Sequence, residues 1–220
     1  GFRVPALGWS TWNHFGSAIN HSIIVDTIDA LVASGLSSAG YEYVNIDDGW
    51  ASHRDADGRI VADPKSFPGG IKPLADHAHA KGVKLGLYTS RGNTTCLGRP
   101  GSAGYEAIDA VTYASWGVDY LKVDSCGHFP PGFIPSDAWA RMRDALNGTG
   151  RPVWLTVCPD CKKDLGNGWG PAEVFSDCGY DAGALGNSWY SERCNMVNVF
   201  GLNNSGKCSN GNPRVPAGVL

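Results

Sequence analysis

The stretch VDYLKVDSC, residues 118–126, decides the fold. Its apolar residues predict a buried strand, and this strand ends directly in a carboxylate, Asp124. Similar short β-rich runs recur along the chain: YEYVNI (41–46), VKLGLY (83–88) and VWLTV (153–157). We expect LGWSTW (7–12) to be the first strand, running into its loop.

Helical patterns separate these runs. Apolar residues at helical spacing, mostly ending at a glycine, occur in IIVDTIDALVASGL (23–36), GIKPLADHAHAKG (70–82), YEAIDAVTYASWG (105–117) and SDAWARMRDALNG (136–148). Successive strands lie about 35–40 residues apart, which suits βα units with right-handed crossovers. The sequence therefore predicts an α/β protein with a parallel sheet.

Polar residues at the strand ends separate two architectures that share this pattern, a doubly wound open sheet and a closed (β/α)8 barrel. A Rossmann-type sheet usually carries G-x-G-x-x-G after its first strand, and no such motif lies there. Instead, nearly every strand ends in reactive or ligand-binding residues: Trp12-Asn13, Asp47-Asp48, Tyr88-Thr89-Ser90, Lys122, Asp124 and Cys158. Such side chains meet at the carboxyl-terminal face of a TIM barrel, so we expect that fold.

The barrel is expected to be incomplete. Five βα units and the start of a sixth occur before residue 190, whereas a full barrel needs about 250 residues. Residues 190–220 have neither a helical nor an alternating period, and they are rich in Asn, Gly, Ser and Pro. We therefore divide the chain into a partial barrel catalytic domain, residues 1–189, and an irregular tail, residues 190–220.

The composition argues against several kinds of partner. With 42% hydrophobic and 18% charged residues, the chain can bury a core. Its net charge of −3 and its 18 scattered Lys and Arg residues offer no basic surface to nucleic acid or anionic lipid. No apolar run approaches the roughly 18 residues of a membrane-spanning helix. We expect no nucleic acid or membrane partner and no cofactor, and the oligomeric state stays open.

The cysteine content indicates an oxidising compartment. Seven cysteines are many for a reduced cytosolic enzyme, and N-x-S/T patterns occur at Asn20, Asn93, Asn147 and Asn203. The chain is therefore expected to be secreted or to reside in the secretory pathway, whether extracellular, vacuolar or lysosomal. The C-x-x-C element 158–161 has no second pair at zinc-site spacing, and the histidines form no metal-binding motif, so no metal is expected.

Asp124 is the first candidate for chemistry. Lys122 lies two residues earlier, on the same face of the strand. A neighbouring ammonium keeps a carboxylate ionised, as a nucleophile that attacks an anomeric carbon requires. A structural Lys–Asp pair or a helix N-cap would have the same spacing, so the residues alone leave both interpretations open.

Asp47 and Asp48 follow another predicted strand. Adjacent side chains point to opposite sides of an extended strand, so only one carboxylate enters the cleft unless the chain turns there. Such a pair can hold sugar hydroxyls, ligate a divalent cation or cap a turn. The aromatic residues nearby can stack on the apolar faces of sugars or fill the core: Trp9, Trp12, Trp50 and Tyr88.

These motifs resemble the alpha-galactosidases, or melibiases, of glycoside hydrolase family 27. The resemblance rests on PALGWSTWNHFG (5–16), GYEYVNIDDGW (40–50), GRIVADPKSFPGGIKPLADHAHAKGVKLGLYTS (58–90), TTCLGRPGSAGYEAIDAVTYASWGVDYLKVDSC (94–126), RMRDAL (141–146) and GNSW (186–189). It implies a retaining exo-glycosidase that hydrolyses terminal alpha-D-galactosyl residues from a small galactoside or oligosaccharide by double displacement. At the matching positions, Asp124 corresponds to the nucleophile of the family. The family residues that contact galactose correspond to Trp12, Asp47, Asp48, Tyr88 and Lys122.

The resemblance also implies a disulfide between Cys96 and Cys126, which would clamp the rim of the site. A second family bridge joins the first loop to the DDCW motif, but this chain has Ser17 and Gly49 at those two positions. The pairing of the remaining cysteines stays open: Cys158, Cys161, Cys178, Cys194 and Cys208.

The sequence departs from the family pattern near its end. Residues 158–160 read Cys-Pro-Asp where the family has C-E-W, a motif that contacts the second hydroxyl of the sugar. Alpha-N-acetylgalactosaminidase and beta-L-arabinopyranosidase activities therefore stay open. Tyr190 and Cys194 stand where the family has an Arg and the general acid/base Asp, so the acid/base is not identified. Other carboxyls lie nearby: Asp177, Asp181 and Glu192.

We hypothesise that the residues after Trp189 are not native family sequence, but come from an intron, a shifted frame or a truncated isoform. The alternative function is accordingly a truncated, catalytically impaired galactose-binding fragment. Loss of a general acid typically costs about 10²–10⁴ in rate.

Overall fold

The computed structural model describes residues 6–132, 138–157 and 175–176. Its strands are β1 (Gly8–Ser10), β2 (Tyr43–Asn45), β3 (Ala51–Arg54), β4 (Ile60–Ala62), β5 (Lys84–Ser90), β6 (Tyr120–Asp124), β7 (Trp154–Val157) and β8 (Phe175–Ser176). Its helices are α1 (Trp12–Phe15), α2 (His21–Ala33), α3 (Lys72–Ala80), α4 (Glu106–Trp116) and α5 (Ala138–Gly148).

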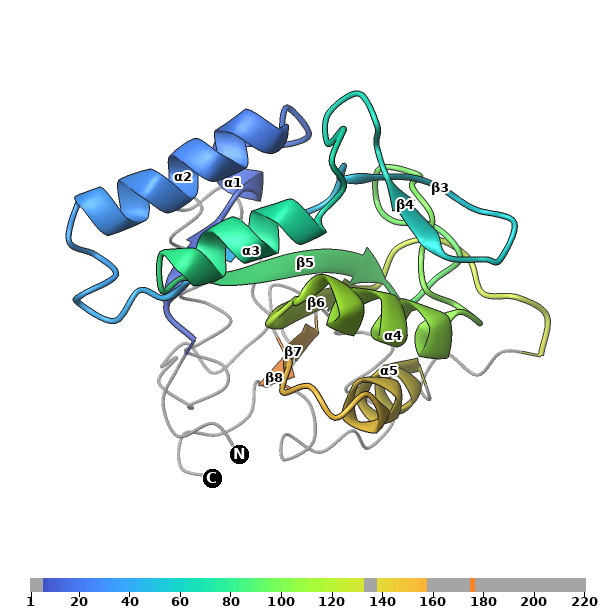
Figure 1. Ribbon diagram of the computed structural model, residues 1–220. Helices are drawn as coiled ribbons and strands as arrows, with labels where there is room; N and C mark the ends of the chain where they lie inside the picture. The colour runs from blue at the N-terminus through green and yellow to red at the C-terminus, as the bar shows by residue number, and fades with distance from the viewer. Residues whose placement is uncertain (1–5, 133–137, 158–174, 177–220) are drawn as a thin grey trace, which may run out of the picture.

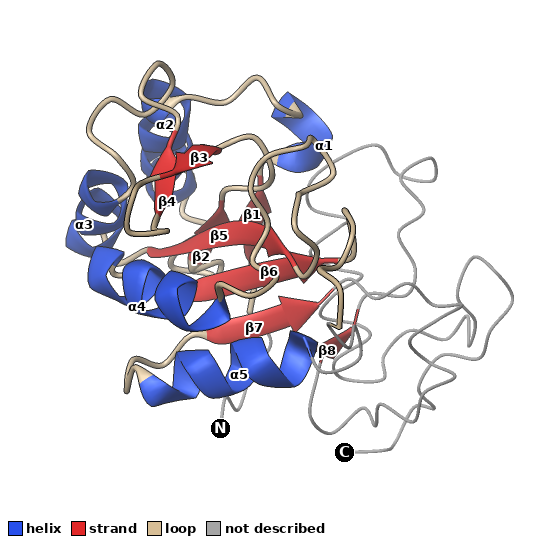
Figure 2. Ribbon diagram, turned by 90° about the vertical axis from the view of Figure 1, so that its right-hand side faces the viewer, coloured by secondary structure: helices blue, strands red, loops and turns tan. Residues whose placement is uncertain are grey.

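Six of these strands form one parallel sheet in the order β1-β2-β5-β6-β7-β8. Neighbouring helices pack on one another in chain order from α2 to α5, and Figure 2 shows α3, α4 and α5 following one another along one side of the sheet. This is the predicted succession of βα units, and the described part of it amounts to an open, incomplete barrel. The predicted fold class is confirmed.

Two details of the sequence prediction were wrong. The first strand ends at Ser10, and Trp12 already begins the short helix α1 rather than continuing the strand. The antiparallel hairpin of β3 and β4, which follows the Asp47–Asp48 segment, was not predicted. Its strands are too short for a clear alternating pattern, and it forms a separate sheet beside the barrel (Figure 1).

The helices bury the side predicted by their apolar spacing. In α2, Ile24, Ile28 and Leu31 recur at helical intervals and are buried. This helix begins two residues before the predicted range because the side chain of Asn20 accepts a hydrogen bond from Ile23 N at 3.0 Å, which caps the helix. Helix α4 ends at Gly117, whose φ of 83° is the left-handed conformation that favours glycine at a helix end.

The two faces of the sheet differ in character. Apolar side chains such as Val44, Leu85 and Leu121 join the helices in one hydrophobic core. A second buried cluster contains Tyr43 and Tyr120, whose ring centroids lie 5.9 Å apart, together with Ala6 and Trp154. Because side chains alternate along a strand, Tyr43 shares its face of β2 with Asn45, and Tyr120 shares its face of β6 with Lys122 and Asp124. This second face therefore changes from aromatic to polar along the strands.

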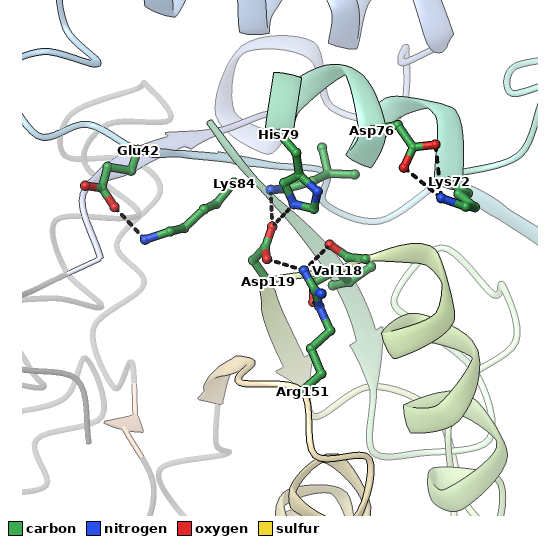
Figure 3. Close-up of polar contacts among 10 residues, drawn as sticks. Glu42, Lys72, Asp76, His79, Lys84, Val118, Asp119 and Arg151 are labelled. Carbon is green, nitrogen blue, oxygen red and sulfur yellow. Dashed lines mark hydrogen bonds and ion pairs between the residues drawn. The ribbon is translucent and has the colours of Figure 1, made fainter. Parts of the chain in front are cut away.

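Asp119 ties the amino-terminal ends of the strands together (Figure 3). Its carboxylate accepts hydrogen bonds from Arg151 at 2.6 Å, from His79 Nε2 at 2.7 Å and from Leu85 N at 3.0 Å. These donors come from three separate segments: the loop before β7, helix α3 and strand β5. The amino-terminal end of a barrel is where conserved polar residues serve stability, so we interpret this network as structural.

Several sequence predictions lie outside the described residues. They concern the segment 158–160, the boundary at residue 189, the tail 190–220, Asn203, the candidate carboxyls Asp177, Asp181 and Glu192, and the cysteines after residue 157. Among the helices of the described part, none is long and apolar enough to cross a membrane.

Candidate active site

The carboxyl ends of β5 and β6 bring a phenol and a carboxylate together. The strand register pairs Tyr88 with Lys122 and Ser90 with Asp124. Tyr88 donates its hydroxyl proton to Asp124 Oδ2 at 2.8 Å, and Ser125 N donates to Asp124 Oδ1 at 2.7 Å. Burial, followed by the negative charge of Asp124, raises the pKa of Tyr88 well above its ordinary value. The phenol is therefore a permanent donor to the carboxylate.

Lys122 connects this pair to the end of β2. Its Nζ lies 2.9 Å from Asp47 Oδ2 and 5.3 Å from the centre of the Tyr88 ring. Both members of the ion pair are largely buried, with side-chain exposures of 12% and 4%. The sequence suggested Asp124 as the partner of this ammonium. In the structure Lys122 reaches across β5 to Asp47, while Asp124 is held by Tyr88.

The chain turns at Asp47 and Asp48, so both carboxylates are buried. Asp48 N donates to Asp47 Oδ1 and Gly49 N to Asp48 Oδ1, each at 2.8 Å. Leu97 N donates to Asp48 Oδ2 at 2.8 Å from the loop that follows β5. Burial raises the pKa of Asp48, although the N–H of Leu97 opposes this by stabilising the ionised form. The sequence had left open whether the chain turns there, and the turn lets both side chains leave the strand.

A disulfide joins Cys96 in the loop after β5 to Cys126 in the loop after β6, with their Cα atoms 5.0 Å apart. This is the pair implied by the resemblance. Cys96 Sγ lies 3.3 Å from the hydroxyl of Tyr88 and 3.5 Å from Asp124 Oδ2, so the bridge borders the Tyr88–Asp124 pair. Cys96, Cys126 and Asp124 are close enough to surround a metal ion. However, sulfur atoms in a disulfide offer no thiolate, so these residues do not form a metal site.

The aromatic candidates have different surroundings. Trp12 is partly exposed and follows Thr11, whose Oγ1 accepts a hydrogen bond from Asp47 N at 3.0 Å. Trp12 therefore lies just beyond the end of β1, beside the Asp47–Asp48 turn. Trp50 is a core residue rather than a sugar-stacking surface: it is 2% exposed, it lies edge-on to Tyr113 and Trp116, and its Nε1 donates to Tyr88 O at 2.8 Å.

Ser17 and Gly49, where the second family disulfide is missing, lie side by side. A Cβ placed on Gly49 would be 3.6 Å from Ser17 Cβ, within the usual range for bridged cysteines. The two substitutions therefore fall at one place in the structure, between the first loop and the Asp47–Asp48 turn.

Sequence reasoning missed two residues that shape the site. Thr11 and Leu97 hold Asp47 and Asp48, Thr11 through its hydroxyl and Leu97 through its backbone N–H. The position of Thr11 at the end of the first strand was a usable signal, because loops after the strands form a barrel site. A backbone donor such as Leu97 N has no sequence signal, since every residue except proline carries one.

Parallel strands that alternate with helices, and that place carboxylates, a phenol and an ammonium at their carboxyl ends, define a (β/α)-barrel enzyme. The family model described as alpha galactosidase A matches residues 4–164, and the chain belongs to this family. The resemblance found in the sequence is thereby confirmed.

Individual relatives agree with this assignment. Alpha-galactosidase A of Cellvibrio japonicus is 48% identical over 174 residues, which are 76% of this chain and 43% of the relative. Alpha-galactosidase of Cyamopsis tetragonoloba is 43% identical over 189 residues, which are 85% and 42% of the two chains. A solved structure of the Saccharomyces cerevisiae alpha-galactosidase with raffinose gives a TM-score of 0.74 at 38% identity, covering 80% of this chain and 40% of that chain. The chain thus spans about two fifths of the length of these relatives.

Proposed function

We propose that this chain carries the nucleophile half of a retaining exo-alpha-galactosidase. The single observation that supports the proposal best is the contact of Asp124 with Tyr88 at strand ends adjoining the Lys122–Asp47 pair. The neighbouring charges agree with a common site, because Asp124, Asp47 and Asp48 all raise the pKa of Tyr88 and Lys122 lowers it. The geometry supports the same view, because the Lys122 ammonium lies 2.9 Å from Asp47 Oδ2 and 5.3 Å from the centre of the Tyr88 ring.

In the proposed reaction, Asp124 attacks the anomeric carbon of a terminal galactosyl residue. Asp47 and Asp48 accept hydrogen bonds from the sugar hydroxyls, Lys122 donates to them, and the ring of Trp12 covers an apolar face of the sugar. Tyr88 holds the carboxylate of Asp124 in place by its hydrogen bond. Attack breaks the bond between the anomeric carbon and the aglycone oxygen, which takes a proton from a second carboxyl or, as p-nitrophenolate, leaves unprotonated. Water then hydrolyses the covalent galactosyl-enzyme with overall retention of configuration.

Retaining glycosidases need a second carboxyl about 5–5.5 Å from the nucleophile. The residues that the family position and its neighbours suggest, from Asp177 to Cys194, all lie outside the described part of the chain. A second candidate function rests on the sequence, because Cys194 stands where the resemblance implies the acid/base Asp. In that alternative the chain binds galactose and turns over galactosides poorly, since loss of a general acid typically costs about 10²–10⁴ in rate.

The assay for the proposal is the hydrolysis of p-nitrophenyl alpha-galactoside by the purified chain. We expect turnover that Asp124→Asn abolishes, because the amide keeps the shape of the side chain but is not nucleophilic. Asp57→Asn is the matched control, since Asp57 lies on the surface. Galactose binding without turnover in the unmodified chain would favour the impaired fragment, and the absence of both would refute the two candidates together.

We also propose a secretory compartment for the protein. The Cys96–Cys126 disulfide needs an oxidising environment, and both Asn20 and Asn147 are exposed within their N-x-S/T patterns. Expression through a eukaryotic secretory pathway should give a product whose mass falls on treatment with an N-glycosidase. A single unmodified mass before treatment would contradict the expected glycosylation.

A further inference from the structure

Arg54 ends β3, and its guanidinium binds three separate segments. Nη1 and Nη2 donate to the two carboxylate oxygens of Asp109 in α4, at 2.6 and 2.7 Å. The same nitrogens donate to the carbonyl oxygens of Gly58 and Gly101, at 2.8 and 2.7 Å. The guanidinium also lies 4.0 Å from the centre of the Tyr105 ring. Arg54 therefore ties the β3–β4 hairpin to α4 and to the loop between β5 and α4, residues 91–105 (Figure 1).

Asp109 extends this connection towards β5. Its side chain is fully buried, and its Oδ2 also accepts a hydrogen bond from Ser102 Oγ at 2.7 Å. Ser102 Oγ in turn lies 2.7 Å from Thr89 Oγ1, and Thr89 follows Tyr88 in the strand. The ion pair thus reaches the end of β5 through two hydroxyls.

The 91–105 loop carries two attachments to the candidate site. Leu97 N donates to Asp48 Oδ2 at 2.8 Å, and Cys96 forms the disulfide with Cys126. The disulfide fixes one point of the loop. The carbonyl of Gly101, four residues beyond Leu97, is fixed by Arg54 from the other side.

We propose that Arg54 and Asp109 are positioning residues of the galactoside site, which hold the 91–105 loop so that Leu97 N orients the Asp48 carboxylate. This inference rests on the proposed role of Asp48 in sugar binding. Arginine is required because its planar fork binds both carboxylate oxygens and still donates to two carbonyls, whereas the compact ammonium of lysine cannot span them.

The test compares four variants with the unmodified chain. Arg54→Lys keeps the charge without the fork, and Arg54→Met leaves the buried Asp109 without its partner. The double variant Arg54→Met/Asp109→Asn removes both charges, so it separates loss of position from the burial of an unpaired carboxylate. Arg59→Met is the matched control, because Arg59 lies in the same hairpin but pairs with Asp57 on the surface, where the exposures are 60% and 69%.

Three quantities are measured: the Kd for galactose, the melting temperature, and amide hydrogen exchange at Leu97. In the double variant we expect a melting temperature above that of Arg54→Met, an increase in Kd of about 10-fold, and exchange at Leu97 faster by about the same factor. Arg54→Lys should shift Kd and exchange in the same direction. The amide of Ile46, bonded to Gly86 O within the sheet, should keep its exchange rate, and Arg59→Met should match the unmodified chain.

The double variant could instead recover the Kd, the melting temperature and the Leu97 exchange rate of the unmodified chain. That result would overturn the proposal and leave Arg54 a purely structural role. If the unmodified chain binds no galactose, the proposed function fails. The exchange measurement then still decides the positioning inference, because it needs no sugar. Unchanged protection of Leu97 in the double variant would refute that inference independently.

Discussion

Restoring a bridge between positions 17 and 49 is the sharpest structural test of how the rim of the site is built. We predict that Ser17→Cys/Gly49→Cys forms a disulfide without rearrangement of the backbone. A Cβ on Gly49 would lie 3.5 Å from Ser17 Cα and 3.6 Å from Ser17 Cβ, and bridged cysteines have Cβ atoms about 3.5–4.5 Å apart.

The expected gain in stability follows from two opposing effects. A bridge that closes a loop of about 32 residues restricts the unfolded chain and should stabilise the fold by about 3.7 kcal/mol. Gly49 has a φ of 103°, a conformation in which an L side chain costs about 1–3 kcal/mol. The net gain in the free energy of unfolding should therefore be about 0.7–2.7 kcal/mol, which raises the melting temperature by a few degrees.

Peptide mapping by mass spectrometry under non-reducing conditions detects the bridge, and calorimetry gives the melting temperature. Gly49→Cys alone isolates the backbone strain and should melt below the unmodified chain, whereas Ser17→Cys alone should melt close to it. Unbridged cysteines in the double variant would refute the placement of Ser17 against Gly49. A bridged variant that melts no higher than Gly49→Cys would refute the energetic reasoning.

Three further predictions concern the strand ends. Lys122→Met leaves the buried Asp47 carboxylate without its cation and should lower the free energy of unfolding in urea titrations by about 3–5 kcal/mol. The double variant Lys122→Met/Asp47→Asn should recover most of this lost stability. Tyr88→Phe removes the hydroxyl donor from Asp124 and should lower kcat by about 10-fold with the fold unchanged by circular dichroism. Burial raises the pKa of the Asp48 carboxyl, so the stability that this group contributes is complete below its ordinary pKa of 3.8 and is lost as the pH rises through the raised pKa. Over that pH range, the melting temperature of the unmodified chain should fall relative to that of Asp48→Asn. A constant difference would contradict the burial argument.

The regular part of the fold was predictable because its signals are local. Short β-rich runs identified the parallel strands, which are buried on both faces, and apolar residues at helical spacing identified the helices. The hairpin of β3 and β4 was missed, although the Asp57-Gly58 pair is a hairpin signal and Gly58 has a φ of 80°. Its short strands do not pair with the main sheet, so the spacing of the βα units gave no reason to expect them.

The site was predictable only as far as side chains at strand ends. Alternation along a strand places Lys122 and Asp124 on one face of β6, but it did not reveal that Lys122 pairs with Asp47 while Tyr88 binds Asp124. The Arg54–Asp109 pair joins residues 55 positions apart and passes through the unpredicted hairpin. No local pattern specifies which of many charged residues will meet across such a distance, so this part of the site needed the structure.

The surroundings of Asp124 differ from those of Asp47, Asp48 and Asp109. Asp47 faces the ammonium of Lys122 and Asp109 the guanidinium of Arg54, so their charge is already neutralised by a direct partner. Asp48 is held by backbone N–H groups but is almost fully buried. Asp124 is partly exposed, and in the described part of the chain its donors are the neutral hydroxyl of Tyr88 and the N–H of Ser125. A carboxylate that is partly exposed and oriented by two hydrogen bonds can reach a bound sugar, which supports our proposal that Asp124 is the nucleophile.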